Sequence, residues 1–317
     1  MVTLRSSKTL AAGAGLAFTA AAGAQLQRRH RHVVERDPAN ARLRSPRRGR
    51  VSSARSADGT ELHVEVFGEE DRPAIVLAHG WTEQLIYWTL VIDNLLDRGF
   101  RVVAFDLRGH GDSEPAVDGD YSLDRFGEDL EAVLAAACRG GERPLVAGHS
   151  LGAMSIVAWA AHHDVGGRVS AAALLNTGVG GLLAEGLLIP VPWLARALGR
   201  TPLARGVLAA KGPLPGFSTP VTHALIRYVA FGPTATPAQV AFYERMLVAC
   251  PPDVRSTVGI ALSEMDLYEA VPRLSVPTLV MAGANDKLTP PSHARRIAQE
   301  LPALHRLIVL PETGHMG

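Results

Sequence analysis

Three residues with the side chains needed for acyl transfer occur in a suggestive order along the chain. Ser150 lies in the pentapeptide GHSLG, Asp286 follows the residues GAN, and His315 ends the tripeptide TGH. A serine hydroxyl becomes a strong nucleophile when an imidazole takes its proton and a carboxylate orients that imidazole. The order Ser, Asp, His therefore predicts Ser150 as nucleophile, His315 as base and Asp286 as the orienting acid.

The residues around Ser150 predict the backbone turn that such a nucleophile requires. Residues 144–148 are a short apolar run typical of a buried strand, and residues 151–162 have the character of a helix. The pattern G-x-S-x-G places a serine on a sharp turn between strand and helix, where flanking glycines relieve crowding. The helix N-terminus behind Ser150 would favour developing negative charge.

Other acids in the sequence fit the third position less well. The apolar run 276–282 leads directly into the loop that holds Asp286. The preceding run ends in Asn176 and Thr177, which carry no charge, and Glu264 and Asp266 fall before the strand rather than after it. Asp286 is therefore the preferred acid.

An oxyanion in this site would need backbone donors. The segment His79-Gly80-Trp81 follows the apolar run 74–78, so the backbone N–H groups of Trp81 and Leu151 are predicted to form the oxyanion hole. We interpret His79 as structural. His110, in the loop DLRGHGDS at residues 106–113, is expected to hold that loop.

The elements that must position these residues alternate between strand and helix. The Asp58-Gly59 turn predicts an antiparallel hairpin near the start of the folded part. Later apolar runs without alternation are typical of strands buried on both faces, and helical periodicity appears between them. This order predicts an α/β fold with a mostly parallel, doubly wound sheet. The expected strands cover residues 51–55, 62–67, 74–79, 101–106, 144–148, 169–176, 276–282 and 306–310, and the expected helices begin at Leu123, Leu151 and Ser292.

Two regions depart from this alternation of strands and helices. Residues 178–252 contain no core strand and are expected to form a helical cap insertion over the carboxyl edge of the sheet, or else additional core helices. Residues 1–50 carry 11 Lys and Arg against two acids, which makes the remaining chain, residues 51–317, mildly acidic. The sequence thus predicts a basic N-terminal segment, a linker at residues 38–50, and a catalytic domain at residues 51–317.

The uncharged, Ala-rich stretch 9–26 within that segment has several interpretations. Arginines follow it directly, which favours an uncleaved anchor or a surface-lying helix, with the catalytic domain on the cytoplasmic side of a membrane. Ala22, Gly23 and Ala24 form an A-x-A pattern, so secretion after signal cleavage is the main alternative, and a flexible extension is the third. No groove-reading motif is found, so nucleic acid is not an expected partner.

The segments HGWTEQ, DLRGHGDS, GHSLG, GANDKLTP and TGH resemble those of the α/β-hydrolase family, across about residues 51–317. The chain is also similar to actinobacterial hydrolases with a basic, Ala-rich N-terminus. The resemblance implies an esterase-like or lipase-like activity with neither metal nor organic cofactor. Ser150 replaces the aspartate of epoxide hydrolases and haloalkane dehalogenases, so those reactions are disfavoured. Cys138 and Cys250 fit no metal or redox spacing.

Hydrolysis of a carboxylic ester with an apolar acyl group is thus the expected function. A thioesterase, a carbon–carbon hydrolase or a cofactor-free perhydrolase could use the same three residues, and a non-catalytic ligand-binding protein is the alternative from another class. The resemblance also implies a final helix beyond the histidine loop, whereas this sequence stops at Gly317. From this ending we expect His315 to be mobile.

Overall fold

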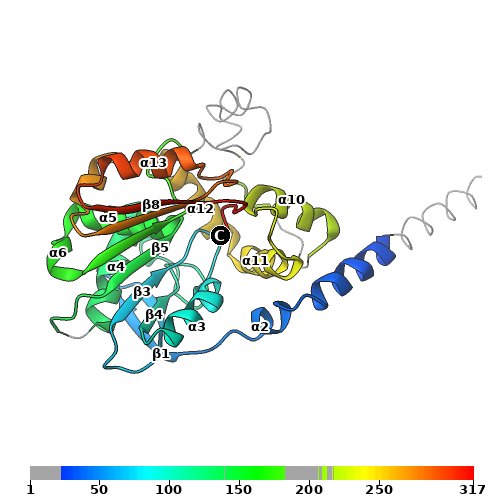
Figure 1. The fold of residues 1–317 in the computed structure, drawn as a ribbon, viewed down its shortest axis with the longest axis horizontal. Coiled ribbons are helices and arrows are strands. Elements are labelled where there is room, and N and C mark those ends of the chain that lie inside the picture. Colours follow the sequence, from blue (N-terminus) through cyan, green and yellow to red (C-terminus); the bar gives the residue numbers. More distant parts are fainter. Residues whose placement is uncertain (1–22, 139, 183–205, 207–208, 213–215, 217) are drawn as a thin grey trace, which may run out of the picture.

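The structure is a computed structural model that describes residues 23–138, 140–182, 206, 209–212, 216 and 218–317. Its centre is an eight-stranded sheet with the order β1-β2-β4-β3-β5-β6-β7-β8 (Figure 1). The strands β1 and β2 pair antiparallel, β2 is antiparallel to β4, and all later neighbours are parallel. The strands are β1 Arg50–Arg55, β2 Glu61–Phe67, β3 Ala74–Ala78, β4 Arg101–Phe105, β5 Leu145–His149, β6 Ala171–Leu175, β7 Thr278–Gly283 and β8 Leu304–Leu310.

Every strand predicted from an apolar run is present, and the predicted fold class is confirmed. The central strands β3 and β4 are buried along their whole length, as expected of strands covered on both faces. The helices and 3₁₀-helices are α2 Asn40–Arg44, η1 Leu85–Trp88, α3 Thr89–Asp97, α4 Leu123–Ala137, α5 Leu151–His162, α6 Val165–Arg168, α10 Pro220–Ala230, α11 Pro237–Ala249, α12 Pro252–Glu264, η2 Tyr268–Arg273 and α13 Pro291–Glu300.

Helices cover the sheet on opposite faces. Alternate residues of β3 enter different cores, because successive side chains of a strand point to opposite sides. Val76 packs in the larger core with Phe126 of α4 and Trp159 of α5. Its neighbour Leu77 packs in a second core with Ile92 of α3. The sheet is therefore the middle layer of three, which is the doubly wound arrangement.

The expected cap is described only in part. Its residues 220–230 and 237–249 form α10 and α11, which lie beside the carboxyl end of the sheet (Figure 1). The apolar stretch 187–194 lies outside the described residues, as do residues 1–22 of the N-terminal segment. The limits of the cap and of the catalytic domain therefore stay predictions.

The N-terminal segment packs against the cap. Residues 23–35 are helical, and the part predicted to be a linker contains helix α2. Leu43 of α2 is buried with Phe242 and Met246 of α11. This apolar contact explains why a stretch rich in Arg, Pro and Ser adopts regular structure. None of the described helices has the length and apolar character required to cross a bilayer.

One buried cation links the hairpin to the main core. Arg108 is fully buried and makes two contacts with Asp129 of α4, at 2.7 Å from Nε and 2.6 Å from Nη2. Its Nη1 also donates to Asp58, in the turn between β1 and β2, over 3.0 Å. A buried guanidinium is stable only when such partners neutralise it. The loop that begins at Asp106 is therefore fastened to two distant elements.

We expect Asp129→Ala to destabilise the protein by about 3–5 kcal/mol, because the substitution leaves the Arg108 charge buried without its main partner. Chemical denaturation monitored by circular dichroism measures the free energy of unfolding. The control is Glu61→Ala, which removes an exposed carboxylate paired with Arg55 and should cost less than about 1 kcal/mol. Equal effects of the two substitutions would contradict the importance of the buried pair.

Candidate active site

Ser150 occupies the predicted turn between β5 and α5. Its backbone adopts φ 49° and ψ −113°, a conformation that residues other than glycine rarely take. The turn is held from outside, because the Ser150 N–H donates to the carbonyl of Leu175 on β6 over 2.9 Å. The hydroxyl of Thr177 donates to the Ser150 carbonyl over 2.9 Å.

The two glycines of the GHSLG pattern are required by close backbone contacts. A Cβ on Gly148 would lie 2.4 Å from the backbone nitrogen of Ala153, and a Cβ on Gly152 would lie 2.2 Å from the carbonyl oxygen of Ala78. Real Cβ atoms do not approach backbone so closely, and backbone cannot rotate away as a side chain can. The pattern is therefore a packing requirement of the strand–helix junction.

Asp286 lies in the loop after β7, as predicted, and its carboxylate is saturated with hydrogen bonds. Its Oδ1 accepts from the backbone N–H groups of Leu288 and Thr289, each over 2.9 Å. Its Oδ2 accepts from the Thr289 hydroxyl and contacts Nδ1 of His315, each at 2.8 Å. Burial disfavours the charged form, but the imidazole and the Thr289 donors outweigh it, so the pKa of Asp286 is lowered. Asp286 is thus an anion aimed at His315.

His315 is fixed rather than mobile, which corrects the expectation drawn from its place near the end of the sequence. Its side chain is 4% exposed. The carbonyl oxygen of His315 accepts from Asn176 Nδ2 over 2.5 Å, and the next residue, Met316, donates its N–H to Ala230 at the end of α10 over 2.8 Å. Packing against the cap therefore fixes the histidine loop.

Gly314 shows how tight that packing is. A Cβ on this residue would lie 2.4 Å from the carbonyl carbon of Phe231 and 2.5 Å from the nitrogen of Gly232. These two cap residues connect α10 to α11. The glycine in TGH therefore allows the cap to rest directly on the histidine loop.

The residues that support His315 were not predicted from the sequence. Asn176, which carries no charge, has φ 45°. Its Oδ1 accepts from the Gly283 N–H over 2.9 Å, and its Nδ2 donates to the His315 carbonyl, so it joins two loops. His149 Nε2 also contacts that carbonyl, at 2.9 Å, and the rings of His149 and His315 lie 4.9 Å apart. His149 immediately precedes Ser150, so these contacts bring the nucleophile turn and the histidine loop together.

A buried ion pair anchors His149 in turn. Its Nδ1 lies 2.9 Å from Oε1 of Glu83, and both side chains are 1% exposed. Oε2 of Glu83 accepts from the Gly80 N–H over 2.6 Å, which ties the loop after β3 to the same cluster. Burial opposes a charge on His149, but Glu83 outweighs that effect, so the pKa of His149 is raised. No spacing rule in the sequence could have paired Glu83 with His149.

The two predicted oxyanion donors lie where the sequence placed them. Trp81 follows β3 in the loop fixed by Glu83, and Leu151 is the first residue of α5. Among the described residues, neither backbone N–H has a hydrogen-bond acceptor, which leaves both free to bind an oxyanion. Their role as oxyanion donors stays a prediction.

His79 and His110 make structural contacts. Nε2 of His79 accepts from the Leu107 N–H over 3.0 Å, and its Nδ1 contacts the Gly80 carbonyl at 2.8 Å. Burial lowers the pKa of His79 well below its ordinary value, and it lowers the pKa of His110 to about 4. Both rings are therefore neutral, and they hold the loops on either side of them.

Two groups of side chains in the described part of the chain have oxygen or nitrogen atoms close enough to share a metal ion. One comprises His30, His223 and Glu244, and the other comprises His63, Asp106 and Asp112. Neither group includes Ser150 or His315.

We expect Glu83→Gln to change how stability depends on pH. A raised histidine pKa contributes stability that is fully present below the unfolded value, about 6.5, and is lost as pH rises through the folded value. Wild type should therefore exceed the variant in unfolding free energy by more at pH 6 than at pH 9, as measured by urea denaturation. His162→Gln, which alters an exposed histidine near Asp124, is the control and should follow wild type. Parallel pH profiles of wild type and Glu83→Gln would disprove a stabilising ion pair.

Comparisons with known proteins agree with this architecture. A family profile described as serine aminopeptidase, S33, matches residues 69–316. A non-heme haloperoxidase from Rhodococcus erythropolis is 32% identical over 273 residues, which cover 82% of this chain and 91% of that protein. A bifunctional esterase/perhydrolase from Acinetobacter calcoaceticus is 27% identical over 267 residues, covering 81% of this chain and 90% of that protein.

Solved structures give the same result. The enol-lactonase from Burkholderia xenovorans LB400 superposes with a TM-score of 0.60 at 26% identity, covering 84% of this chain and 92% of the enol-lactonase. The profile, the relatives and the sheet order together show that this chain belongs to the α/β-hydrolase family, within the group described as serine aminopeptidase, S33.

Proposed function

We propose that this hydrolase cleaves carboxylic esters through Ser150, His315 and Asp286. The observation that carries the proposal is the buried contact between His315 Nδ1 and Asp286 Oδ2 at 2.8 Å. This contact leaves Nε2 of His315 as the basic nitrogen. Ser150 sits on a positive-φ turn at a helix N-terminus, and His149, the residue before it, contacts the His315 carbonyl at 2.9 Å. An imidazole oriented by a carboxylate is the group that a serine nucleophile requires.

The proposed reaction proceeds through an acyl-enzyme. His315 takes the Ser150 proton as Oγ attacks the carbonyl carbon of the ester, and the N–H groups of Trp81 and Leu151 bind the developing oxyanion. His315 then protonates the leaving alcohol. Water, activated by the same imidazole, attacks the acyl carbon and releases the acid. Asp286 stays ionised throughout, because His315 and the Thr289 donors lower its pKa against the opposing effect of burial.

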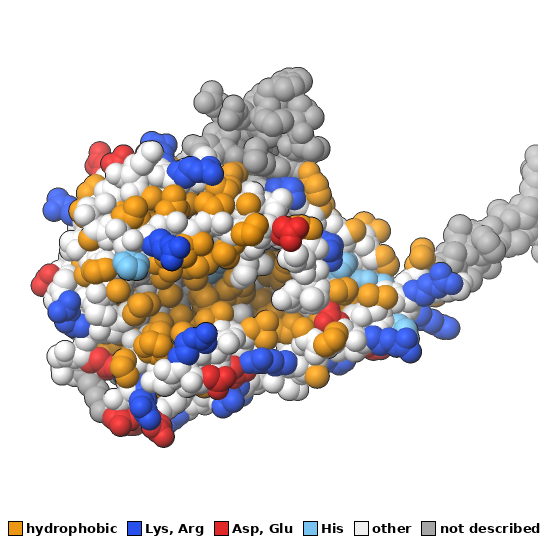
Figure 2. Space-filling view, viewed as in Figure 1, with side chains coloured by type: hydrophobic (Ala, Val, Ile, Leu, Met, Phe, Trp, Pro, Cys, Tyr) orange, Lys and Arg blue, Asp and Glu red, His pale blue; other side chains and the backbone are white. Residues whose placement is uncertain are grey.

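An apolar acyl group fits the surface near this site. Apolar side chains gather on the viewed face around the C terminus, where the histidine loop lies (Figures 1 and 2). Tyr87 stacks on His149 at 4.7 Å between ring centroids. Phe231 and Tyr243 of the cap have ring centroids 6.1 Å apart, in an apolar cluster that includes Met316 of the histidine loop. Such surroundings favour an apolar substrate group and strengthen the electrostatic interactions of the triad.

Perhydrolysis is a second candidate, supported by relatives named as a haloperoxidase and a bifunctional esterase/perhydrolase. In that reaction hydrogen peroxide replaces water as the attacker of the acyl-enzyme, and the product is a peracid. Both reactions use the same acyl-enzyme, so the choice depends on which nucleophile reaches it. Assays of one p-nitrophenyl ester with and without hydrogen peroxide distinguish the two outcomes by peracid formation.

We expect a fluorophosphonate probe to label Ser150 and Ser150→Ala to abolish both labelling and p-nitrophenyl ester hydrolysis. The loss of kcat should be on the order of 10⁴-fold or more, because the nucleophile itself is removed. Asp286→Asn should lower kcat by roughly 10³–10⁴-fold, since the amide no longer holds the required imidazole tautomer. A panel of esters with increasing acyl length tests the apolar preference.

The matched control is Ser155→Ala on the same helix, whose hydroxyl donates to the Leu151 carbonyl over 2.8 Å. This variant should keep both labelling and turnover. A folded wild-type protein that is not labelled, or a Ser150→Ala variant with unchanged turnover, would refute the proposed nucleophile.

We also propose that the N-terminal segment associates with an anionic membrane surface, with the catalytic domain on the cytoplasmic side. Arg28, Arg29 and Arg31 are exposed on the helical residues 23–35, and Figure 2 shows basic side chains along this helix. The neighbouring cap helix α10 exposes an apolar row at Val221 and Leu225, which are 76% and 61% exposed. Basic and apolar side chains together are typical of surfaces that bind lipid head groups.

The full-length chain should sediment with phosphatidylglycerol vesicles and only weakly with phosphatidylcholine vesicles. Arg28→Glu combined with Arg29→Glu should weaken sedimentation at least about tenfold, given roughly 1 kcal/mol per basic residue near an anionic surface. The control is Arg98→Glu, at an exposed arginine outside the segment. Binding that is insensitive to salt and to the double substitution would contradict this electrostatic association.

A further inference from the structure

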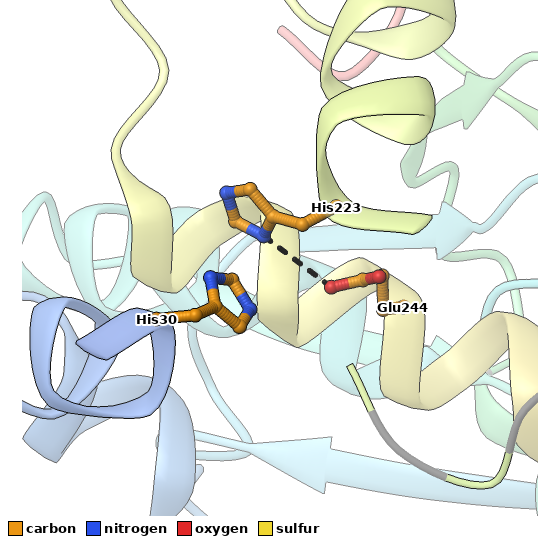
Figure 3. A group of neighbouring side chains, drawn as sticks. All are labelled: His30, His223 and Glu244. Atoms are coloured by element: carbon orange, nitrogen blue, oxygen red, sulfur yellow. Dashed lines mark hydrogen bonds and ion pairs between the residues drawn. The ribbon is translucent and has the colours of Figure 1, made fainter. Parts of the chain in front are cut away.

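Two imidazoles and a carboxylate from three separate helices converge where the N-terminal segment meets the cap (Figure 3). His30 belongs to the helical residues 23–35, His223 to α10 and Glu244 to α11. One nitrogen or oxygen atom of each lies within 4.8 Å of those of the other two. Nδ1 of His223 is already 3.4 Å from Oε2 of Glu244, close to the roughly 3.3 Å that separates neighbouring ligands around a tetrahedral ion with bonds near 2 Å.

Neighbouring hydroxyl groups orient the carboxylate. Thr222 donates to Oε1 of Glu244 over 2.8 Å, which leaves Oε2 turned toward the two histidines. The hydroxyl of Ser218 donates to Oε2 and lies 2.8 Å from Nε2 of His30, so it bridges the two side chains. Thr222 is a partner of the kind that fixes a metal ligand, because it binds the carboxylate oxygen that faces away from the histidines. The Ser218 hydroxyl lies between Oε2 and His30, so it has to move aside when an ion binds.

A path for an ion exists from one side. A cavity of about 650 Å³ lies between residues 23–44 and α11, and His30 and Ser218 form part of its wall. The cavity can also supply a water molecule as a further ligand. Two histidines and one glutamate with an open position are a frequent zinc arrangement.

We propose that His30, His223 and Glu244 bind a divalent transition-metal ion, best matched by Zn²⁺, that fastens the N-terminal helix to the cap. Imidazole ligands favour zinc over the harder Mg²⁺ and Ca²⁺. Without the ion, polar contacts join this helix to the cap, including the one from Gln27 Nε2 to the Ser218 carbonyl over 2.6 Å. The ion adds a cross-link among three helices and is independent of the proposed ester hydrolysis.

The test uses full-length, tag-free protein treated with a chelator and then dialysed. Titration calorimetry with Zn²⁺ should give one site per chain, and Mg²⁺ should not compete. His30→Ala and His223→Ala should each weaken zinc binding at least about tenfold. His32→Ala, at an exposed histidine on the same helix, is the matched control and should bind like wild type.

A second measurement reports the cross-link itself. Zinc should slow tryptic cleavage after Arg28, Arg29 and Arg31 in wild type and in His32→Ala, but not in His223→Ala, which leaves the N-terminal helix unaltered. Circular dichroism checks that each variant folds. The proposal is overturned if wild type binds no zinc, if His30→Ala and His223→Ala bind it as tightly as wild type, or if zinc leaves wild-type cleavage unchanged. The first two results would identify the cluster as a hydrogen-bond network alone, and the third would refute the cross-link.

Discussion

The turn at Ser150 is the constraint on which the surrounding structure depends. Ser150 has a side chain and yet adopts φ 49°. This turn is possible because Gly148 and Gly152 have no Cβ, which lets the backbone of Ala153 and Ala78 pack directly against them. The Ser150 N–H is fixed by β6 and its carbonyl by Thr177, so two strands and one helix converge on a single residue. This arrangement raises the serine above the carboxyl edge of a buried parallel sheet, where loops from other strands can reach it.

The histidine loop has a different kind of support. Asn176 and His149 both contact the His315 carbonyl and so fix the backbone of the loop. Asp286 contacts Nδ1 and so fixes the imidazole ring. Because His149 is bound to Glu83, the loop after β3 belongs to the same buried polar network. A buried network of this type fixes the relative positions of the loops that contribute to it. The nucleophile turn, the oxyanion donors and the base are therefore positioned together.

The cap and the N-terminal segment extend this support outward. The connection between α10 and α11 rests on Gly314, and Met316 donates to the last turn of α10. Helix α11 also contacts the N-terminal segment. Leu43 of α2 packs against it, and the Asp37 carboxylate accepts from the Ala238 N–H over 2.9 Å. A continuous set of contacts thus runs from the N-terminal helix through the cap to the histidine loop.

The sequence by itself determined the strand order in the chain, the fold class and the residues proposed for catalysis. Those features depend on local signals: apolar runs of strand length, the glycines around Ser150, and the places of Asp286 and His315 directly after strands. Only the tertiary structure decided how His315 is held, that Glu83 pairs with His149, that Asn176 joins two loops, and that residues 40–44 form a helix on the cap. These contacts join residues far apart in sequence, and their partners are chosen by packing. No periodicity or spacing encodes that choice, because a buried polar group is satisfied by whichever donor or acceptor the fold brings within reach.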